Sequence, residues 1–267
     1  MKIIPVIDVL NGIAVHAIRG ERRHYRPLKS VLCSSVDPVE VALTFESLGF
    51  DRLYLADLDA ILGKSTDFAL YQRIHAKTNL VFMVDAGVAE ATIAEKLLKA
   101  GVSEIVIGTE TLRSLEFVNQ AVKSFGEDRV VVSVDLKKGK VMSVSENVKS
   151  MSPVLLAQTL EKIGVDQIIL LDLDRVGTER GTNVKVLKDV LEKTKVKVLA
   201  GGGIRSLQDL ENLRTLGVSG ALVATALHNE KLKVNELKSM GFLCMRACKP
   251  VYAPNSKTDW PCHDFRI

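Results

Sequence analysis

The chain contains an internal repeat, and this repeat limits the folds it can adopt more than any other feature does. Residues 100–109 (AGVSEIVIGT) align with residues 216–225 (LGVSGALVAT). Two further pairs of segments also match: residues 55–59 with 170–174, and residues 5–12 with 132–139. Self-similarity at about half the chain length indicates two related halves.

Each half alternates short apolar runs with helical patterns, giving eight strand-then-helix units. The expected strands span residues 2–8, 52–57, 80–84, 104–107, 129–135, 167–172, 198–200 and 220–223. Nearly continuous apolar strands separated by helices are typical of a parallel sheet that is buried on both faces. Eight units in two matching halves predict an α/β fold, a (β/α)8 TIM barrel built from two similar half-barrels. An open doubly wound sheet is the alternative, but it does not require the repeat.

The chain of 267 residues has the length of one such barrel, which is typically ~250 residues. We expect the barrel over residues 1–243, with half-barrels at about 1–125 and 126–243. Residues 244–267 are expected to form a short irregular tail. This tail carries Cys244, Cys248, Cys262 and His263, whose spacing suits a tetrahedral zinc site poorly, so no metal site is predicted.

Composition narrows the functional class. Hydrophobic residues make up 47% and charged residues 25% of the chain, as in ordinary soluble globular proteins. A net charge of +4 is too small and too scattered to indicate nucleic acid as a partner. No apolar run approaches the ~18 residues of a membrane span, and four cysteines do not make a disulfide framework in a chain of this length. We therefore expect a cytoplasmic protein; its oligomeric state stays open.

Three consecutive glycines end the seventh expected strand and precede a Ser-x-x-Asp helix start. Backbone N–H groups can approach a ligand closely at such a turn, and this position favours an anion. Gly202 and Gly203 are therefore candidate phosphate-binding residues, with Ala224 and Thr225 closing the site from the next strand end. Barrels of this class often bind phosphate with their last two loops. A tight turn without a ligand is the alternative.

Aspartates end several of the expected strands. Asp8 and Asp135 occupy matching positions in the two halves, each followed by a turn that contains glycine. Two carboxylates at carboxyl ends of strands on opposite sides of a barrel mouth suit general acid and base catalysis. Helix or turn capping is the alternative. Asp57 and Asp172 form a second symmetric pair, for which a structural and a substrate-orienting role are both open.

Over residues 1–240 the sequence resembles the HisA/HisF family of histidine biosynthesis, and more closely its isomerase branch. The resemblance rests on Pro-Val-Ile-Asp8, Val-Ser-Val-Asp135, the Asp174-x-x-Gly-Thr178 loop and the glycine loop. It implies a two-fold β/α barrel that rearranges an aldose to a ketose on a phosphorylated ribotide. It also implies that Asp8 and Asp135 are the acid and base, that Thr178 contacts the substrate, and that no cofactor is needed.

The chain departs from the family pattern in the first half. Asp85 stands where Gly201 stands in the second half, Tyr54 replaces a usual histidine, and the loop after strand five lacks a tryptophan. Gly108 and Thr109 could compensate only partly for the lost glycines. We therefore expect a single phosphate, held by the second half, with Asp85 facing a hydroxyl or amine. The alternative is that Asp85 points away and the backbone still binds phosphate.

Three functions remain open at this point. The leading one is a HisA-like isomerase that acts without a cofactor on a phosphorylated, sugar-derived small molecule. The second is a related enzyme outside histidine biosynthesis, a lyase or condensing enzyme with a singly phosphorylated substrate. The third is a barrel that only binds, which the retention of both Asp8 and Asp135 disfavours.

Overall fold

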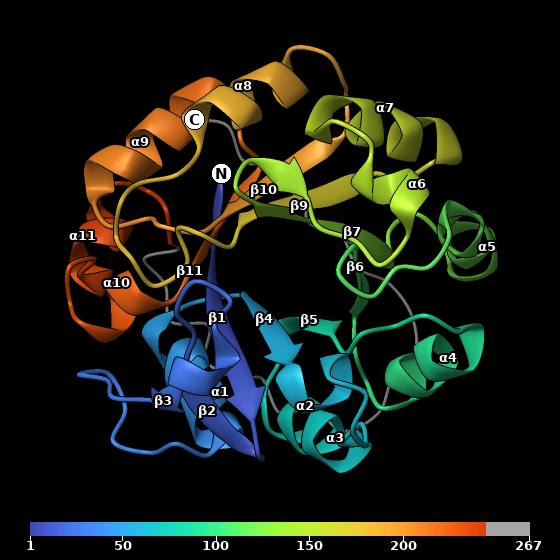
Figure 1. Cartoon of the computed structure of the whole chain (residues 1–267). Helices are drawn as coiled ribbons and strands as arrows, with labels where there is room; N and C mark the ends of the chain where they lie inside the picture. Colours follow the sequence, from blue (N-terminus) through green and yellow to red (C-terminus); the bar gives the residue numbers. More distant parts are fainter. Residues whose placement is uncertain (244–267) are drawn as a thin grey trace, which may run out of the picture.

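The computed structural model describes residues 1–243, in which eight parallel strands close into a barrel (Figure 1). The barrel strands are β1 (Lys2–Leu10), β4 (Arg52–Asp57), β5 (Val81–Asp85), β6 (Glu104–Gly108), β7 (Val130–Lys137), β9 (Gln167–Asp172), β10 (Lys197–Gly201) and β11 (Gly220–Val223). They pair in this order, and β11 pairs back with β1. The predicted TIM barrel is confirmed. The predicted tail, with its cysteines at 244, 248 and 262, lies outside the described residues.

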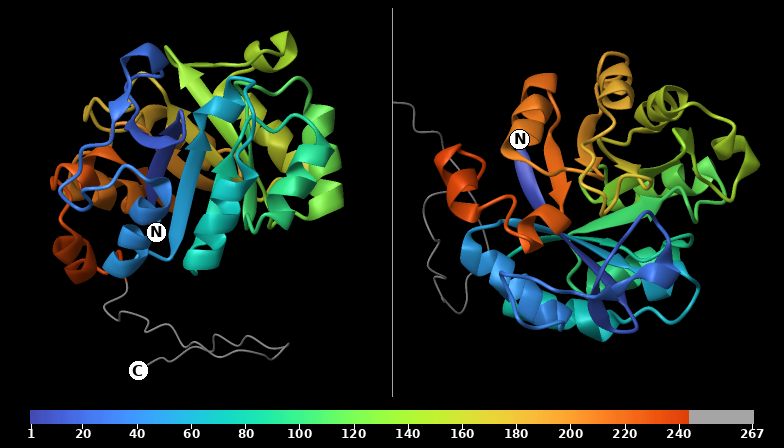
Figure 2. Two further views of the ribbon diagram at one scale, coloured as in Figure 1. Left: turned by 90° about the horizontal axis from the view of Figure 1, so that it is seen from below. Right: turned by 60° about the vertical axis from the view of Figure 1, so that its left-hand side comes forward.

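Helices form a ring around the strands (Figures 1 and 2). The ring contains α1 (Pro38–Leu48), α3 (Phe68–Lys77), α4 (Ala91–Lys99), α5 (Leu115–Phe125), α7 (Pro153–Ile163), α8 (Val184–Leu191), α9 (Leu207–Leu216) and α11 (Val234–Ser239). Shorter helical turns are α2 (Leu58–Ile61), α6 (Glu146–Lys149), α10 (Thr225–His228) and the 3-10 turn η1 (Arg22–His24). Among residues 1–243, no helix has the length and apolar character needed to cross a bilayer.

The first strand of each half continues into a β-hairpin, so the internal sequence repeat is matched by a repeated backbone structure. β1 turns into β2 (Ile13–His16), which pairs in turn with β3 (Arg26–Pro27), and β7 turns into β8 (Lys140–Val141). The two tight turns have the same backbone shape: φ is 53° and 75° at Asn11 and Gly12, and 53° and 72° at Lys138 and Gly139. Positive φ at both central residues gives the twist that two-residue hairpins favour.

Apolar side chains fill both faces of the barrel wall. An inner cluster packs inside the barrel and includes Ile4, Met83, Val106, Val131, Ile169 and Leu199. A larger cluster lies between the strands and the surrounding helices. Because side chains alternate along a strand, residues two apart from an inner-cluster residue also face the barrel interior. This alternation determines which strand-end residues can reach a ligand.

Candidate active site

A cavity of about 280 Å3 opens at the carboxyl ends of the barrel strands. Its walls include side chains from the ends of β1, β4, β5, β7, β9 and β11 and the glycines after β10. This is the face on which TIM-barrel enzymes place their active sites. The acidic lining residues are Asp8, Asp85, Glu110, Asp135 and Glu179, and the basic ones are Arg22 and Lys137.

Strand alternation separates the predicted aspartates into two groups. Asp85 follows Met83 of the inner cluster by two residues, and Asp8 and Asp135 likewise share the inward face of their strands and line the cavity. Asp57 and Asp172 instead follow the inward-facing Ala56 and Leu171 by one residue. They therefore lie on the outward face of the barrel wall, and neither lines the cavity.

The outward pair makes structural contacts. Asp57 caps α2 by accepting a hydrogen bond from the Ala60 N–H at 3.0 Å, and it also accepts one from the buried Tyr71 hydroxyl. Asp172 accepts a hydrogen bond from the Asn183 side chain at 3.1 Å and pairs with Arg175 at 3.3 Å. These contacts anchor the loops behind the cavity, so the structural interpretation of this pair is the one that the geometry supports.

Asp135 is held by several donors. Its Oδ1 accepts a hydrogen bond from Ser133 Oγ at 2.8 Å, and its Oδ2 accepts from the Glu110 N–H at 3.2 Å and from Thr109 Oγ1 at 3.4 Å. Burial raises the pKa of the Asp135 carboxyl to about 6, and these hydrogen bonds limit the rise by stabilising the charged form. Asp135 is therefore a carboxyl that is fixed in position and titrates near neutral pH.

Asp8 lies on the opposite side of the barrel, because β1 and β7 are separated by three strands in either direction. It is partly buried, and its carboxyl has no hydrogen-bond donor among residues 1–243. Burial raises its pKa to about 7. Two carboxyls that titrate near neutrality thus flank the cavity from diametrically opposed strands.

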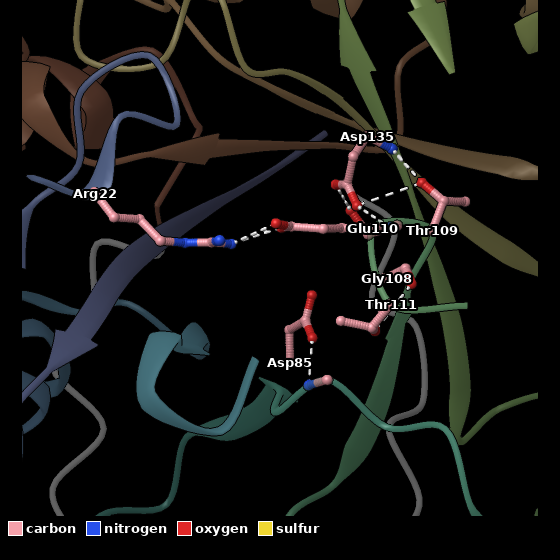
Figure 3. A network of polar contacts seen from close by, with 9 residues as sticks. Arg22, Asp85, Gly108, Thr109, Glu110, Thr111 and Asp135 are labelled. Atoms are coloured by element: carbon pink, nitrogen blue, oxygen red, sulfur yellow. Dashed lines mark hydrogen bonds and ion pairs between the residues drawn. The ribbon is translucent and has the colours of Figure 1, made fainter. Parts of the chain in front are cut away.

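Asp85 also lines the cavity, and Gly108 lies between it and Asp135 (Figure 3). Its Oδ1 accepts the Gly87 N–H at 3.0 Å. Burial and the nearby Asp135 charge raise the pKa of Asp85 to about 8. The alternative prediction, in which Asp85 points away from the site, is wrong because the phase of β5 turns its side chain inward.

An ion pair crosses the mouth of the barrel. Arg22 from η1 reaches Glu110 in the loop after β6, with N–O distances of 2.6 and 2.7 Å (Figure 3). The Glu110 backbone in turn supports Asp135. Arg22 is not among the site residues predicted from the sequence. Its role depends on a contact between residues 88 positions apart, which no local pattern signals.

The glycine loop lies against its neighbour and lines the cavity. Gly202 and Gly203 have φ of +95° and +87°, and an added Cβ would lie 2.4 Å from the Asp172 carbonyl oxygen and 2.3 Å from that of Gly181. Packing therefore requires these glycines whether or not a ligand binds. Both still face the cavity together with Ala224 and Thr225. The structure thus brings these four predicted phosphate-binding residues to one end of it.

The other predicted phosphate-binding residues do not line the cavity. Thr178 donates its hydroxyl to the Arg175 carbonyl at 2.8 Å. Thr109 is fully buried, and it accepts the Asp135 N–H at 2.9 Å. Gly108 lies beneath the acidic residues, where a Cβ would be 2.9 Å from Asp85 Oδ2 and 3.5 Å from Asp135 Oδ2. Thr109 and Gly108 therefore position the carboxylates.

Metal ligation finds no support in this geometry. In the part of the chain that the structure describes, no three His, Cys, Asp or Glu side chains are grouped closely enough to hold a metal ion. The acidic side chains of the cavity are spread around the barrel wall. They suit hydrogen bonding and proton transfer with a substrate.

Comparison with known proteins identifies the family. The model of a family described as histidine biosynthesis protein matches residues 2–233. The chain belongs to this family.

Named relatives of the histidine biosynthesis family cover nearly the whole chain. Proteins of Halothermothrix orenii and Streptococcus thermophilus are each 34% identical to it; the first covers 89% of this chain and 98% of its own length, the second 90% and 100%. Both are named as isomerases of an imidazole-4-carboxamide with a 5-phosphoribosyl and a 5-phosphoribosylamino group. An uncharacterized protein of Methanocaldococcus jannaschii is 37% identical over 89% of this chain and 97% of its own length. The expectation of an isomerase-type enzyme is confirmed.

Proposed function

We propose that this protein catalyses an aldose–ketose rearrangement of an N-substituted 5-phosphoribosylamine, with Asp8 and Asp135 as the proton-transfer pair. The observation that carries the proposal is the placement of these two carboxyls on diametrically opposed strands of one cavity, each with a pKa near neutrality. The names of the isomerase relatives support the same reaction class.

The rearrangement requires a proton on the ring oxygen and then the transfer of hydrogen from C2 and its hydroxyl to C1, and the pair carries out both. One carboxyl donates a proton to the ring oxygen as the C1–O bond breaks, which gives an open-chain iminium. A carboxylate then removes the C2 proton to give a neutral enol-amine. This enol-amine gains a proton at C1 while its C2 hydroxyl returns a proton to a carboxylate of the pair, which gives the amino-ketose. A group that titrates near the working pH serves as donor and as acceptor with similar ease. The burial that raises the pKa of Asp8 and of Asp135 therefore suits this chemistry.

The glycine end of the cavity suits the substrate phosphate. The backbone N–H groups of Gly203 and Ile204 donate to no acceptor within residues 1–243, and both residues line the cavity. Free N–H groups of this kind favour an anion. A phosphate there, with the ribose chain toward Asp8 and Asp135, places the reacting carbons between the carboxyls.

A direct assay tests this function. Purified protein is incubated with two compounds: the bisphosphorylated imidazole-carboxamide ribotide of the relatives, and a 5-phosphoribosylamine with a small N-substituent. NMR then follows formation of the amino-ketose. Conversion of either compound supports the proposal, and conversion of neither contradicts it. Complementation of a histidine auxotroph that lacks the isomerase then tells whether the substrate is the histidine intermediate.

A further inference from the structure

The two halves of the barrel present different chemistry to the same cavity. β5 and β10 are equivalent strands of the repeat, and Asp85 occupies in β5 the position of Gly201 in β10. Beyond β10 the wall is glycine backbone with free N–H groups. At the end of β5 the wall is the buried Asp85 carboxyl, and the Gly87 N–H of the following loop donates to Asp85 itself. The β5 loop therefore offers an acceptor where the β10 loop offers donors.

Two buried polar side chains on this side of the cavity, Tyr54 and Asp85 itself, each have a ligand-facing atom without a hydrogen-bond partner in the described chain. Tyr54 is 95% buried and lines the cavity, yet its hydroxyl makes no hydrogen bond with any described residue. Asp85 is 7% exposed, and only its Oδ1 is occupied within the described chain. Buried polar groups are normally paired. Unpaired ones that face a cavity are therefore candidates for ligand contacts.

The cations that line the cavity do not neutralise these carboxyls. Arg22 is paired with Glu110 at 2.6 Å. Lys137 donates to the Arg19 carbonyl at 2.7 Å and lies 3.6 Å from Asp174. The β5 side of the cavity is thus acidic, with the Asp85 and Asp135 carboxyls on either side of Gly108.

We propose that the β5 side of the cavity, formed by Asp85, Tyr54 and Asp135, binds a positively charged nitrogen group of the substrate. The substrate then carries one phosphate, at the glycine end, and an amine or amidine at the acidic end. This inference rests on the proposed function and specifies its substrate class. A second phosphate is disfavoured, because the β5 loop has no free glycine N–H to receive it and further negative charge is unfavourable beside the buried Asp85 and Asp135 carboxyls. A cationic nitrogen gains charge-assisted hydrogen bonds from the same groups.

A series of three probes tests the proposal with the full chain. 1-Amino-1-deoxyribulose 5-phosphate, ribulose 5-phosphate and ribulose 1,5-bisphosphate share one phosphate and differ at C1, as ammonium, hydroxyl and phosphate. Calorimetry measures the affinity of each. We expect the amine to bind at least ~10-fold more tightly than the alcohol, as one charged hydrogen bond provides, and the bisphosphate to bind most weakly.

Variants test whether Asp85 causes the preference for the amine over the alcohol. Asp85→Asn keeps the shape and the acceptor for Gly87, so it is expected to fold; it should reduce the amine preference to within about threefold of the alcohol. Asp128→Asn, at an exposed aspartate, is the matched control and should leave the series unchanged. Asp85→Asn should also bind the bisphosphate more tightly than the wild type does.

The outcomes separate this inference from the proposed function. If wild-type protein binds the bisphosphate as tightly as the amine, or if Asp85→Asn leaves the order unchanged, the inference is wrong while the phosphate site stands. If none of the three probes binds, the glycine-end phosphate site fails, and both the proposed function and this inference fall.

Discussion

Asp85 of β5 and Asp135 of β7 approach one point from the two strands that flank β6, and Gly108 at the end of β6 lies at that point. A Cβ at Gly108 would be 2.9 Å from Asp85 Oδ2 and 3.5 Å from Asp135 Oδ2. The strand between the two carboxyls therefore has to carry a residue without a side chain. Two buried like charges in this arrangement resist simultaneous ionisation, which contributes to the raised pKa of Asp85.

Asp85→Asn should change how stability depends on pH. A carboxyl whose pKa is raised from 3.8 to about 8 holds a proton in the folded state that the unfolded chain loses. The free energy of unfolding of the wild type should therefore fall as pH rises from about 4 to about 8, by up to ~1.4 kcal/mol per pH unit for this group. Asp85→Asn should lose this part of the slope and be more stable than the wild type at pH 8. Urea unfolding at several pH values measures this pH dependence, with Asp128→Asn as control. Parallel plots of the free energy of unfolding against pH for wild type and Asp85→Asn would contradict the prediction.

Ser133→Ala should shift the acid limb of the profile of kcat/KM against pH. Ser133 Oγ donates to Asp135 Oδ1 and favours the charged carboxylate. Without this bond the pKa of Asp135 should rise above about 6, so the acid limb of kcat/KM should shift to higher pH. Ser143→Ala is the control, because that hydroxyl donates to the Leu112 carbonyl instead. An unshifted limb in Ser133→Ala would mean that Asp135 does not set it.

Gly203→Ala should abolish anion binding at the glycine end. Its φ of +87° strains any L-residue, and the new Cβ would lie 2.3 Å from the Gly181 carbonyl oxygen. Gly217→Ala is a matched control, since φ is +90° there and nothing lies within 4 Å of the new Cβ. Both variants should lose about 1–3 kcal/mol to backbone strain, and Gly203→Ala should lose more. A crystal grown with sulfate should show the ion beside Gly203 and Thr225 in wild type and Gly217→Ala only; side chains filling that space would contradict the phosphate site.

Tyr71→Phe distinguishes between a structural role and a substrate-orienting role of Asp57. The substitution removes the hydroxyl that Asp57 accepts from, in a fully buried position. We expect a loss of about 1–3 kcal/mol in the free energy of unfolding, with kcat and KM of the folded enzyme unchanged. A large change in KM at equal stability would instead give Asp57 a role with the substrate.

The sequence predicts the fold well because the signals for the barrel are local and repeated. Apolar strand runs, the helices between them and the matched segments 100–109 and 216–225 each predict the same architecture. The placement of Asp8 and Asp135 around one cavity could also be predicted, since equivalent strand ends of a repeat lie at the same face of the barrel.

Strand phase limits what could be predicted about the other site residues. Asp57 and Asp172 show the same symmetric signal as Asp8 and Asp135, but one residue of offset turns them to the outer face. Thr178 and Thr109 match a motif, yet their hydroxyls contact neighbouring chain atoms. The pairing of Arg22 with Glu110 depends on the folding of two distant loops over the barrel, which no sequence pattern shows.

The turnover of Asp8→Asn and Asp135→Asn with a 5-phosphoribosylamine substrate tests the central claim most directly. Each substitution keeps the shape of the side chain and removes its ability to carry the proton. We predict that each variant lowers kcat by ~10²-fold or more, with a circular dichroism spectrum like that of wild type and Asp128→Asn at full activity. Near-normal turnover by either variant would remove that residue from the mechanism and contradict the account.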